Sequence, residues 1–344
     1  MKTSLIIGFR GQDGSFLKNL LSSEGHNLIL ATSNLDLYNS HLSKIIQEKI
    51  KFTYLDVRDK NSINHTLIEH NIDNIFNFAT EGGVGYSFTN PGSAFAVHTL
   101  GVFNILDSII ELGLENELYY FQSLSGEIFG ETYLSPHNEL SPIKPLSPYA
   151  TAKANAFNLC NLYREVYGLK IGSGLLFNHE SEIRPSHYVT KKIVKGLIDN
   201  QIDSKNILEL GSLDFSRDWI FAGDAIRAIN LMAENMYSGN LIIAGGVKKT
   251  IQDFVEKTME ILEINKSIDE IVVLNREFLR KKELVSTFGD STKIRQLFNW
   301  QLDYTFDDLI KRMIYHELNE QSALGRDIPS KLQSIKVNLE QFKV

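Results

Sequence analysis

Tyr149 and Lys153 lie four residues apart in the stretch 147–153, which reads Ser-Pro-Tyr-Ala-Thr-Ala-Lys. On a helix this spacing places the phenol and the ammonium on one face. A nearby cation favours phenolate and lowers a tyrosine pKa from about 10 toward values that suit a general base. A lone pair of this kind is more typical of a solvated helix face, so the catalytic interpretation depends on the other motifs.

Ser125 and Glu127 lie two residues apart in a loop of small residues, just after a predicted strand at 118–122. Ligands of open α/β sheets bind beyond the carboxyl ends of the strands. A hydroxyl and a carboxylate at this place are therefore candidates for orienting a substrate and moving its protons. The alternative is that Glu127 is an ordinary exposed acid in a loop.

Gly8, Gly11 and Gly14 recur at three-residue intervals between a predicted strand at 4–8 and a predicted helix at 15–24. Glycine permits the tight turn and the close approach of backbone to a pyrophosphate, and the free N–H groups at the helix start receive the anion. The pattern predicts a dinucleotide site. A glycine-rich turn without a ligand is the alternative, which the strand-turn-helix context disfavours.

The adenosine ribose is usually recognised at the end of the second strand, by an acid for a free 2'-hydroxyl or by an arginine for a 2'-phosphate. The residues there are Thr32, Ser33 and Asn34, which are all neutral. Their chemistry does not choose between NAD and NADP. Asp56 follows the third predicted strand and is a candidate acceptor for the adenine amino group, or a turn aspartate.

Strands and helices alternate through the first half of the chain, which predicts an α/β fold with a Rossmann-type doubly wound parallel sheet. The later elements alternate less regularly and indicate a smaller mixed α/β lobe. We expect residues 1–176 plus about 221–244 to form the dinucleotide-binding domain and about 177–220 plus 245–320 to form the substrate lobe. Residues 321–344 form a C-terminal tail for which the sequence predicts no particular structure. The expected strands are 4–8, 27–32, 52–55, 74–78, 118–122, 170–176 and 207–210, and the helices 15–24, 61–70, 94–112, 148–167, 189–200, 224–234, 251–264 and 305–318, the last with Thr305 as N-cap.

Composition limits the classes of partner. The 344 residues carry a formal net charge of −7, which argues against a nucleic-acid binder because phosphate neutralisation needs a concentrated basic surface. The one cysteine, Cys160, can form neither an internal disulfide nor a zinc site with other cysteines, so we expect a reducing, cytoplasmic location and no metal. No apolar stretch reaches the roughly 20 residues of a membrane span, so no membrane is expected.

Together, the glycine triplet, Asn77-Phe78-Ala79 and the Tyr149/Lys153 pair resemble the extended short-chain dehydrogenase/reductase superfamily. Within it the chain resembles the GDP-mannose 4,6-dehydratase family, in register from about residue 3 to about 318. The stretches that carry this likeness are 11–15, 176–181, 189–193, 210–214, 217–219 and 289–293.

The resemblance implies a set of site residues. The catalytic set is Ser125, Glu127, Tyr149 and Lys153. With the candidates named above, the cofactor-binding set is Gly8, Gly11, Gln12, Asp13, Gly14, Ser33, Asn34, Asp56, Val57, Phe78, Ala79, Tyr149, Lys153, His179 and Arg184. The substrate-binding set is Ser87, Ser125, Glu127, Tyr149, Asn178, Lys192, Arg217, Arg280 and Glu283, with Arg217 the first choice for phosphate because its fork offers two parallel donors. The alternative for Arg217 is a surface ion pair with Asp218.

The chain departs from the family pattern at several places. Ser125 stands where threonine is typical, Gly126 where serine is and Phe129 where tyrosine is. Ser33 and Asn34 replace two arginines, and Ile183 replaces one of a pair, leaving Arg184. The resemblance implies NADP, while the missing arginines leave NAD open. It also implies a homodimer or a homotetramer. The stretch 81–83, Glu-Gly-Gly, differs from the usual Gln-Ser-His, so the sugar pocket is expected to differ as well.

The leading hypothesis is a nucleotide-sugar 4,6-dehydratase, a lyase that acts on GDP-mannose or a related GDP-sugar and contributes to deoxysugar synthesis. Tyr149 takes the 4-hydroxyl proton as hydride leaves C4, Glu127 takes the C5 proton as the 6-hydroxyl departs, and hydride returns to C6. One alternative is a nucleotide-sugar 4-epimerase, which needs Tyr149 but has no task for Glu127. Another is a non-catalytic nucleotide-binding scaffold, which the departures motivate.

Overall fold

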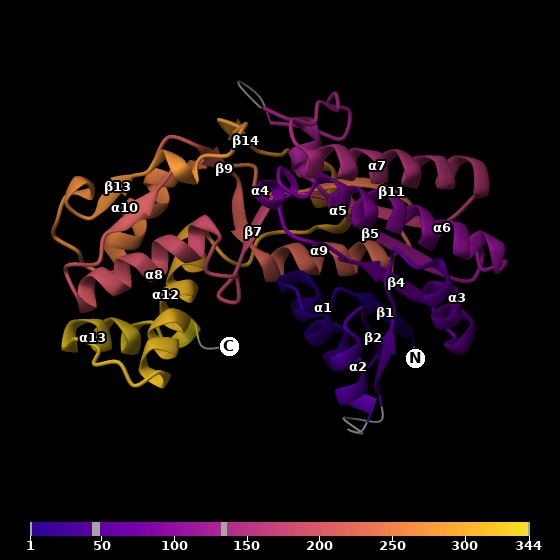
Figure 1. The fold of residues 1–344 in the computed structure, drawn as a ribbon, viewed down its shortest axis with the longest axis horizontal. Coiled ribbons are helices and arrows are strands. Elements are labelled where there is room, and N and C mark those ends of the chain that lie inside the picture. The colour runs from indigo at the N-terminus through magenta and orange to yellow at the C-terminus, as the bar shows by residue number, and fades with distance from the viewer. Residues whose placement is uncertain (1, 43–48, 132–135, 343–344) are drawn as a thin grey trace.

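The computed structural model describes residues 2–42, 49–131 and 136–342, and its centre is a seven-stranded parallel sheet. The strand order is β11-β6-β5-β4-β1-β2-β3, and every neighbouring pair is parallel, which confirms the predicted fold class (Figure 1). The strands are β1 (Thr3–Ile7), β2 (Asn27–Thr32), β3 (Ile50–Tyr54), β4 (Asn74–Asn77), β5 (Tyr119–Ser125), β6 (Ile171–Leu176) and β11 (Gly239–Ile243).

Helices cover both faces of the sheet. One face carries α1 (Gln12–Ser23) and α9 (Ala222–Glu234), which pack against each other, and the other carries α3 (Lys60–Glu69), α6 (Gly101–Glu111) and α7 (Pro148–Tyr167). Successive residues of the central strand β5 are buried on opposite faces: Tyr119 and Phe121 in one core, Tyr120 in the other. Burial on both faces explains why the strands read as nearly continuous apolar runs.

The strand order reverses between β1 and β4, because β2 and β3 extend the sheet from β1 while β5, β6 and β11 extend it from β4. At such a switch point the connections leave toward opposite faces and open a crevice beyond the carboxyl ends of the strands. The glycine turn follows β1 and the pair Phe78-Ala79 follows β4. The predicted cofactor motifs therefore border the same crevice.

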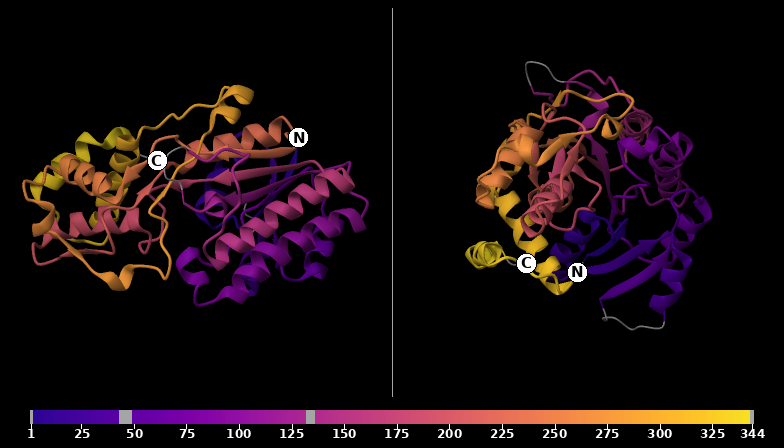
Figure 2. Two further views of the ribbon diagram at one scale, coloured as in Figure 1. Left: turned by 90° about the horizontal axis from the view of Figure 1, so that it is seen from above. Right: turned by 60° about the vertical axis from the view of Figure 1, so that its left-hand side comes forward.

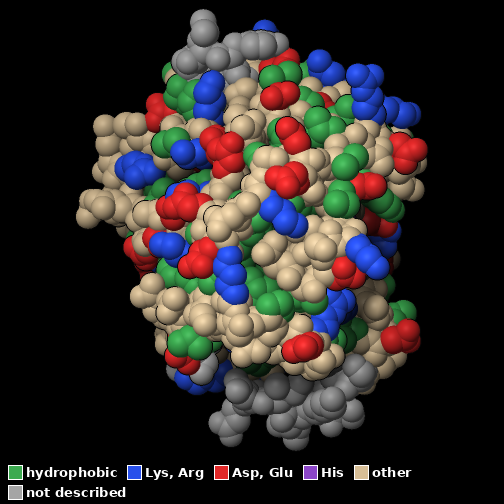
Figure 3. Space-filling view, turned by 90° about the vertical axis from the view of Figure 1, so that its left-hand side faces the viewer, with side chains coloured by type: hydrophobic (Ala, Val, Ile, Leu, Met, Phe, Trp, Pro, Cys, Tyr) green, Lys and Arg blue, Asp and Glu red, His purple; other side chains and the backbone are tan. Residues whose placement is uncertain are grey.

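A second lobe lies to one side of the sheet domain (Figure 2). Its core is built on α8 (Val189–Ile202), α10 (Ile251–Ile261) and α12 (Phe306–Ala323). Small sheets accompany them: β7 (Asn178–Glu180) with β10 (Trp219–Phe221), β8 (Leu208–Leu210) with β13 (Val272–Leu274), and β9 (Ser216–Arg217) between β12 (Lys249–Thr250) and β14 (Ser286–Thr287). The predicted N-cap is confirmed: Thr305 and Asp308 form a capping box at the start of α12. Acidic and basic side chains are interspersed on this end of the molecule (Figure 3).

Four α-helices of the described residues were not predicted, and two of them, α4 (Val84–Ser87) and α11 (Thr292–Phe298), are short. Helix α2 (Leu35–Leu42) follows β2, and helix α13 (Ser330–Asn338) lies in the tail whose structure the sequence left open. Leu332, Ile335 and Leu339 of the tail are buried in the core of the lobe. The tail is thus part of the folded lobe.

The expectation that no apolar stretch reaches the length of a membrane span was wrong. The continuous helical run Pro91–Glu111 consists of α5 (Pro91–Phe95), the π-helix η1 (Ala96–Leu100) and α6. By length and composition it could cross a membrane, with a mean hydropathy of 1.4 over an 18-residue window. Of these 18 residues, 56% are buried inside the protein, where α6 packs on α3 and α7. Burial in the core accounts for most of its apolar character.

A buried ion pair ties the loop after β7 to helix α12. The guanidinium of Arg312 donates two hydrogen bonds to the carboxylate of Glu182, both 2.8 Å long. Glu182 is 2% exposed and Arg312 is 7% exposed. Removing one partner of such a pair leaves an uncompensated buried charge, which is far more costly than losing a surface pair.

We expect Glu182→Gln to lower the free energy of unfolding by about 3 kcal/mol, because the Arg312 charge stays buried without its counterion. Urea denaturation followed by circular dichroism measures this. The matched control is Glu320→Gln, which removes a half-exposed carboxylate 3.0 Å from Lys191 and should cost less than about 1 kcal/mol. Equal losses in the two variants would contradict the role given to burial.

Candidate active site

The glycine turn has the geometry that a dinucleotide needs. Gly8 has φ +86°, and a Cβ on it would lie 2.8 Å from the carbonyl oxygen of Phe78. A Cβ on Gly14 would lie 2.4 Å from the carbonyl oxygen of Gly8. Gly11 is the N-cap of α1 and no side chain caps the helix, so its first N–H groups face the crevice without a side-chain acceptor. These residues fit a pyrophosphate held at a helix N-terminus.

Asp13 and His179 form an ion pair that joins the glycine turn to the lobe. Asp13 Oδ1 lies 2.9 Å from His179 Nε2, and His179 Nδ1 donates to the Phe177 carbonyl oxygen over 2.7 Å. Burial opposes the charge on Asp13, but the charge and hydrogen bond of His179 lower its pKa to about 2. Burial likewise opposes the imidazolium, yet Asp13 raises the pKa of His179.

Gln12 strengthens the same junction. Its amide nitrogen donates to the carbonyl oxygen of His179 over 3.0 Å, and its amide oxygen accepts from the hydroxyl of Ser181 over 2.7 Å. Three of the predicted cofactor residues, Gln12, Asp13 and His179, are therefore brought together by the fold. Their side chains bond one another across the crevice, which sets the spacing between the sheet domain and the lobe.

Tyr149 and Lys153 share one face of α7, as predicted. Ser147 caps this helix by accepting from the N–H of Ala150, and Pro148 occupies its first position. Lys153 is 3% exposed; its Nζ donates to the carbonyl oxygen of Ser123 over 2.8 Å and lies 5.8 Å from the centroid of the Tyr149 ring. Burial lowers the pKa of Lys153 to about 8.

The prediction that Lys153 lowers the pKa of Tyr149 was wrong for the chain alone. Burial raises the pKa of Tyr149, and the negative charge of Glu127 raises it further. A hydrogen bond with Ser125 and the charge of Arg184 act in the opposite direction. The Lys153 ammonium is directed to the Ser123 carbonyl, so desolvation dominates the phenol.

Ser125 and Glu127 lie at the carboxyl end of β5, beside Tyr149. Ser125 ends the strand and caps the short 3-10 helix Gly126–Phe129 by accepting from the N–H of Glu127 over 3.3 Å. Burial raises the pKa of Glu127, while the charges of Arg217 and Arg280 oppose the shift. The site thus holds a carboxyl group poised to exchange protons. Packing explains why residue 126 is glycine, because a Cβ at this position would lie 2.8 Å from the Phe177 ring.

Three predicted substrate residues, Arg217, Arg280 and Glu283, form a group in the lobe. Arg217 Nη2 lies 3.7 Å from Glu283 Oε2, and Arg280 Nε lies 3.6 Å from Glu283 Oε1. Arg217 Nη1 also donates to two carbonyl oxygens, of Ser216 and Leu284. Among the described residues Arg217 has no ion pair with Asp218, whose carboxylate instead accepts N–H groups of three glycines, Gly245, Gly246 and Gly289.

Lys192 and Asn178 also belong to the lobe. Lys192 lies on α8 with its Nζ 3.3 Å from the centroid of the Phe278 ring, in the segment that also carries Arg280. Asn178 begins β7 and pairs with Trp219 of β10. The fold therefore places five predicted substrate residues in the lobe, while Ser87 and the catalytic residues belong to the sheet domain.

Several predicted site residues have local partners. The buried Ser87 hydroxyl donates to the Val84 carbonyl oxygen and accepts from the Tyr149 N–H over 3.1 Å, so it positions the start of α7. Asn34 caps α2, and Ser33 beside it is exposed. Asp56 accepts from both the backbone and the guanidinium of Arg58, which is the turn aspartate weighed above. Val57 packs against Gly101, and Arg184 pairs with Glu180 over 2.9 Å.

Sequence reasoning missed His98. Its ring meets the ring of Tyr149 edge-on with a centroid separation of 5.1 Å, and it is 2% exposed. Burial lowers its pKa to about 2, and its Nε2 has no hydrogen-bond partner in the described part of the chain. A neutral imidazole thus packs on the phenol. His98 lies in a π-helical turn, whose register no helical periodicity reveals.

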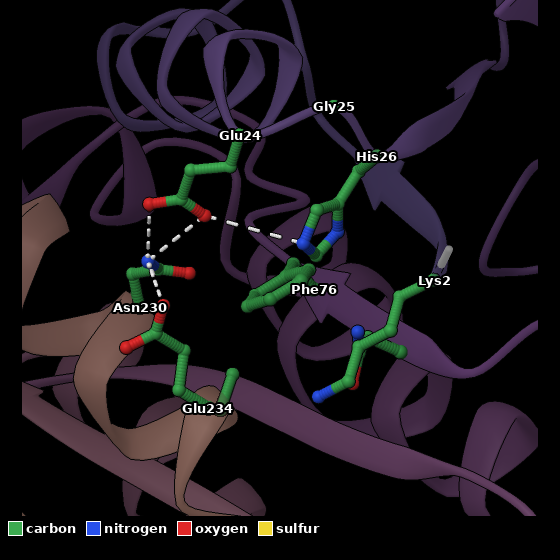
Figure 4. A pocket seen from close by; sticks show the side chains of 9 residues that line it. Lys2, Glu24, Gly25, His26, Phe76, Asn230 and Glu234 are labelled. Carbon is green, nitrogen blue, oxygen red and sulfur yellow. Dashed lines mark hydrogen bonds and ion pairs between the residues drawn. The ribbon is translucent and has the colours of Figure 1, made fainter.

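A cavity of about 500 Å³ lies away from this site, at the amino edge of the sheet. Glu24, His26, Asn230 and Glu234 are among the residues that line it (Figure 4). The Asn230 amide donates to both carboxylates, at 3.0 Å to Glu24 and 3.3 Å to Glu234. None of the predicted site residues lines this cavity. Within the described ranges, no group of three His, Cys, Asp or Glu side chains could hold a metal ion.

Comparison with known proteins agrees with this geometry. A family model described as GDP-mannose 4,6 dehydratase matches residues 5–313. A GDP-mannose 4,6-dehydratase of Sinorhizobium fredii is 30% identical over 340 residues, covering 92% of this chain and 97% of that protein. GDP-mannose 4,6 dehydratase 1 of Arabidopsis thaliana is 31% identical over 327 residues, covering 92% of this chain and 90% of that protein.

Among solved structures, the dTDP-glucose 4,6-dehydratase of Bacillus anthracis in complex with NAD has the same fold. Its TM-score is 0.79 at 20% sequence identity, covering 94% of this chain and 98% of that one. The family model and the curated relatives each extend over nearly the whole chain, so the likeness includes both the sheet domain and the lobe. The chain belongs to the GDP-mannose 4,6-dehydratase family.

Proposed function

We propose that the protein is a nucleotide-sugar 4,6-dehydratase that converts GDP-mannose to its 4-keto-6-deoxy product with loss of water. The observation that carries the proposal is the pair of proton-transfer groups at the carboxyl end of β5 and the start of α7, Glu127 and Tyr149, which lie close enough that the charge of Glu127 raises the pKa of Tyr149. A nicotinamide dinucleotide held by the glycine turn would supply the hydride chemistry at C4 and C6. The chain itself must therefore manage two separate protons.

Tyr149 accepts the proton of the sugar 4-hydroxyl. The Ser125 hydrogen bond and the Arg184 charge favour its phenolate, in opposition to burial and Glu127. Lys153 holds the end of β5 through the Ser123 carbonyl and adds positive charge near the ring. The neutral ring of His98 packs edge-on against the phenol ring of Tyr149. The tyrosine is thus fixed in orientation before the substrate arrives.

Glu127 removes the proton from C5, which the ketone at C4 has made acidic, and delivers it to the departing 6-hydroxyl to form water. Burial raises the pKa of this carboxyl above that of a free glutamate, which improves it as a donor while it can still act as an acceptor. Tyr149 releases to solvent the proton it took from the 4-hydroxyl, and C5 takes a proton from solvent as hydride reaches C6, so both side chains return to their starting states. Arg217 and Arg280, held by Glu283, are proposed to bind the diphosphate, with Asn178 and Lys192 beside them. The 4-epimerase alternative gives Glu127 no reaction step.

We expect purified protein to form a 4-keto product from GDP-mannose, followed by its alkaline absorbance. Glu127→Gln should lower kcat by about 10²-fold or more, because the C5 proton loses its acceptor, and should leave cofactor affinity unchanged. Glu117→Gln, a change at an exposed acid at the far edge of the sheet, is the control. Full activity of Glu127→Gln would overturn the assignment, and 4-epimer formation would favour the epimerase.

The proposed cofactor is NADP, bound with its 2'-phosphate near Arg10. Arg10 lies in the exposed glycine turn after β1, and the described residues offer it no ion-pair partner. Ser33 follows the neighbouring strand β2, so both residues extend from the same edge of the sheet. An unpaired guanidinium there suits a phosphate and would replace the absent arginine pair. Arg58 is committed to Asp56 instead.

Titration with each dinucleotide tests this cofactor preference. We expect NADP to bind at least tenfold more tightly than NAD, and Arg10→Ala to remove most of the difference. Arg58→Ala removes a guanidinium that is already paired and should keep the preference. Equal affinities of the unaltered protein for the two dinucleotides, or a preference for NAD, would refute the proposal.

The proposed assembly is a homodimer formed through the exposed side of the helical run that starts at Pro91. Phe95, Leu100 and Phe103 are 37–47% exposed there and line a shallow groove of about 530 Å³ with Leu159 of α7. Leu162 and Val166 extend this apolar face along α7. A large exposed apolar face on a protein of this class is typical of a subunit contact. A cytoplasmic location is proposed with it, since Cys160 is buried and unpaired.

Light scattering during gel filtration tests the dimer. We expect the unaltered protein to elute at about twice its chain mass of 39.0 kDa, and Leu100→Glu to elute as a monomer, because a carboxylate cannot be buried unpaired in the contact. Leu140→Glu makes the same change at a leucine that is 93% exposed in another loop and should leave the mass unchanged. A dimer that survives Leu100→Glu would place the contact elsewhere.

A further inference from the structure

Tyr188 extends from the lobe toward the loop that follows β4. It is the N-cap residue of α8, and its hydroxyl oxygen lies 3.5 Å from the place where a Cβ on Gly83 would be. Apart from the residues next to Gly83 in the chain, no other atom of the described residues lies within 4 Å of this Cβ position. Within the described residues there is therefore room for a Cβ beside Gly83, and a phenolic hydroxyl borders that room.

The backbone does not require glycine at position 83. Gly83 has φ −111° and ψ −162°, an extended conformation that any residue adopts. Gly82 beside it has φ +69°, and a Cβ there would collide with the Tyr86 ring. The backbone conformation therefore explains why residue 82 is glycine. It does not explain why residue 83 is glycine, so the effect of Gly83 is that it leaves the space of a side chain empty.

Two neighbouring side chains contact the Tyr188 ring. The guanidinium carbon of Arg184 lies 4.0 Å from the ring centroid, a cation-π contact, and the ring of His187 lies 4.5 Å away. Arg184 is itself fixed by Glu180 Oε2, which also accepts from Thr190 over 2.7 Å. The ring is therefore anchored, while its hydroxyl makes no hydrogen bond within the described residues.

The hydroxyl also lies close to the reacting groups. Charges on Tyr188 and Arg184 both act on the titration of the Tyr149 phenol. The short helix α4 (Val84–Ser87) starts directly after Gly83 and is joined to Tyr149 by the bond from its N–H to the Ser87 hydroxyl. Gly83, Tyr149 and Tyr188 thus come from three elements that meet at one place.

We propose that Tyr188 is a specificity-determining residue that donates a hydrogen bond from its hydroxyl to a hydroxyl group of the substrate's hexose, which enters the space left open by Gly83. The proposal rests on the proposed function for the identity of the substrate. An anchored phenol with an unused donor loses little conformational freedom when it binds. A polar group placed to bond a substrate hydroxyl also discriminates strongly against sugars that lack that hydroxyl.

Binding measurements on the full chain with NADP present separate the hexose from the nucleotide. We expect Tyr188→Phe to weaken GDP-mannose binding by roughly tenfold and GDP binding by less than twofold. Gly83→Val fills the open space without straining the backbone and should produce the same split. Tyr167→Phe removes a phenol hydroxyl at the far end of α7 and is the matched control; it should change neither affinity.

Unchanged GDP-mannose affinity in both Tyr188→Phe and Gly83→Val, or an equal loss for GDP and GDP-mannose, would overturn the proposal. Melting temperatures of the variants identify a loss caused by misfolding, which would lower both affinities together. Failure of the proposed function is a separate result, namely no turnover of GDP-mannose by the unaltered protein. The comparison of GDP-mannose with GDP needs no turnover, so it decides the Tyr188 contact by itself.

Discussion

The ion pair between Asp13 and His179 is the contact on which the geometry of the cleft depends. It joins the first turn of α1 to β7, so it fixes the lobe against the glycine turn across 166 residues of sequence. It also solves an electrostatic problem, since an unpaired carboxylate at a helix N-terminus would repel a pyrophosphate. Asp13 raises the pKa of His179 and so favours the imidazolium; when His179 is protonated, the charge of Asp13 is balanced and the N–H groups of the helix keep their attraction for an anion.

Burial in the crevice shifts the pKa values of three titratable groups at the site, Glu127, Tyr149 and Lys153. Desolvation raises the pKa of Glu127 and of Tyr149, and lowers that of Lys153 to about 8. The arginines of the lobe oppose the first shift and the Ser125 hydrogen bond opposes the second. The result is one crevice that holds a carboxyl and a phenol whose neutral forms are both favoured by burial, positioned by two domains that the Asp13–His179 pair holds together.

Much of this could be predicted from residue order alone, because strong periodicity and turn chemistry are local. The strand Asn27–Thr32 and the helix Pro148–Tyr167 have their predicted bounds, and the glycine turn lies where its spacing indicated. Helices α2 and α13 were missed because their apolar spacing is weak. The Asp13–His179 pair, the π-turn that carries His98 and the place of Tyr188 arise from tertiary packing. The direction of the Tyr149 pKa shift was mispredicted for the same reason, since burial outweighs the sequence neighbour Lys153.

We propose that a single site moves a hydride from C4 to C6 of the same sugar while a separate base exchanges the proton at C5. The most direct test is mass spectrometry and NMR of the product formed from GDP-mannose labelled with deuterium at C4, in ordinary and in heavy water. The account predicts that the C4 deuterium is found at C6 of the same molecule and that C5 gains deuterium from heavy water. Deuterium that is lost from the product or retained at C4, with C5 unexchanged, would contradict it.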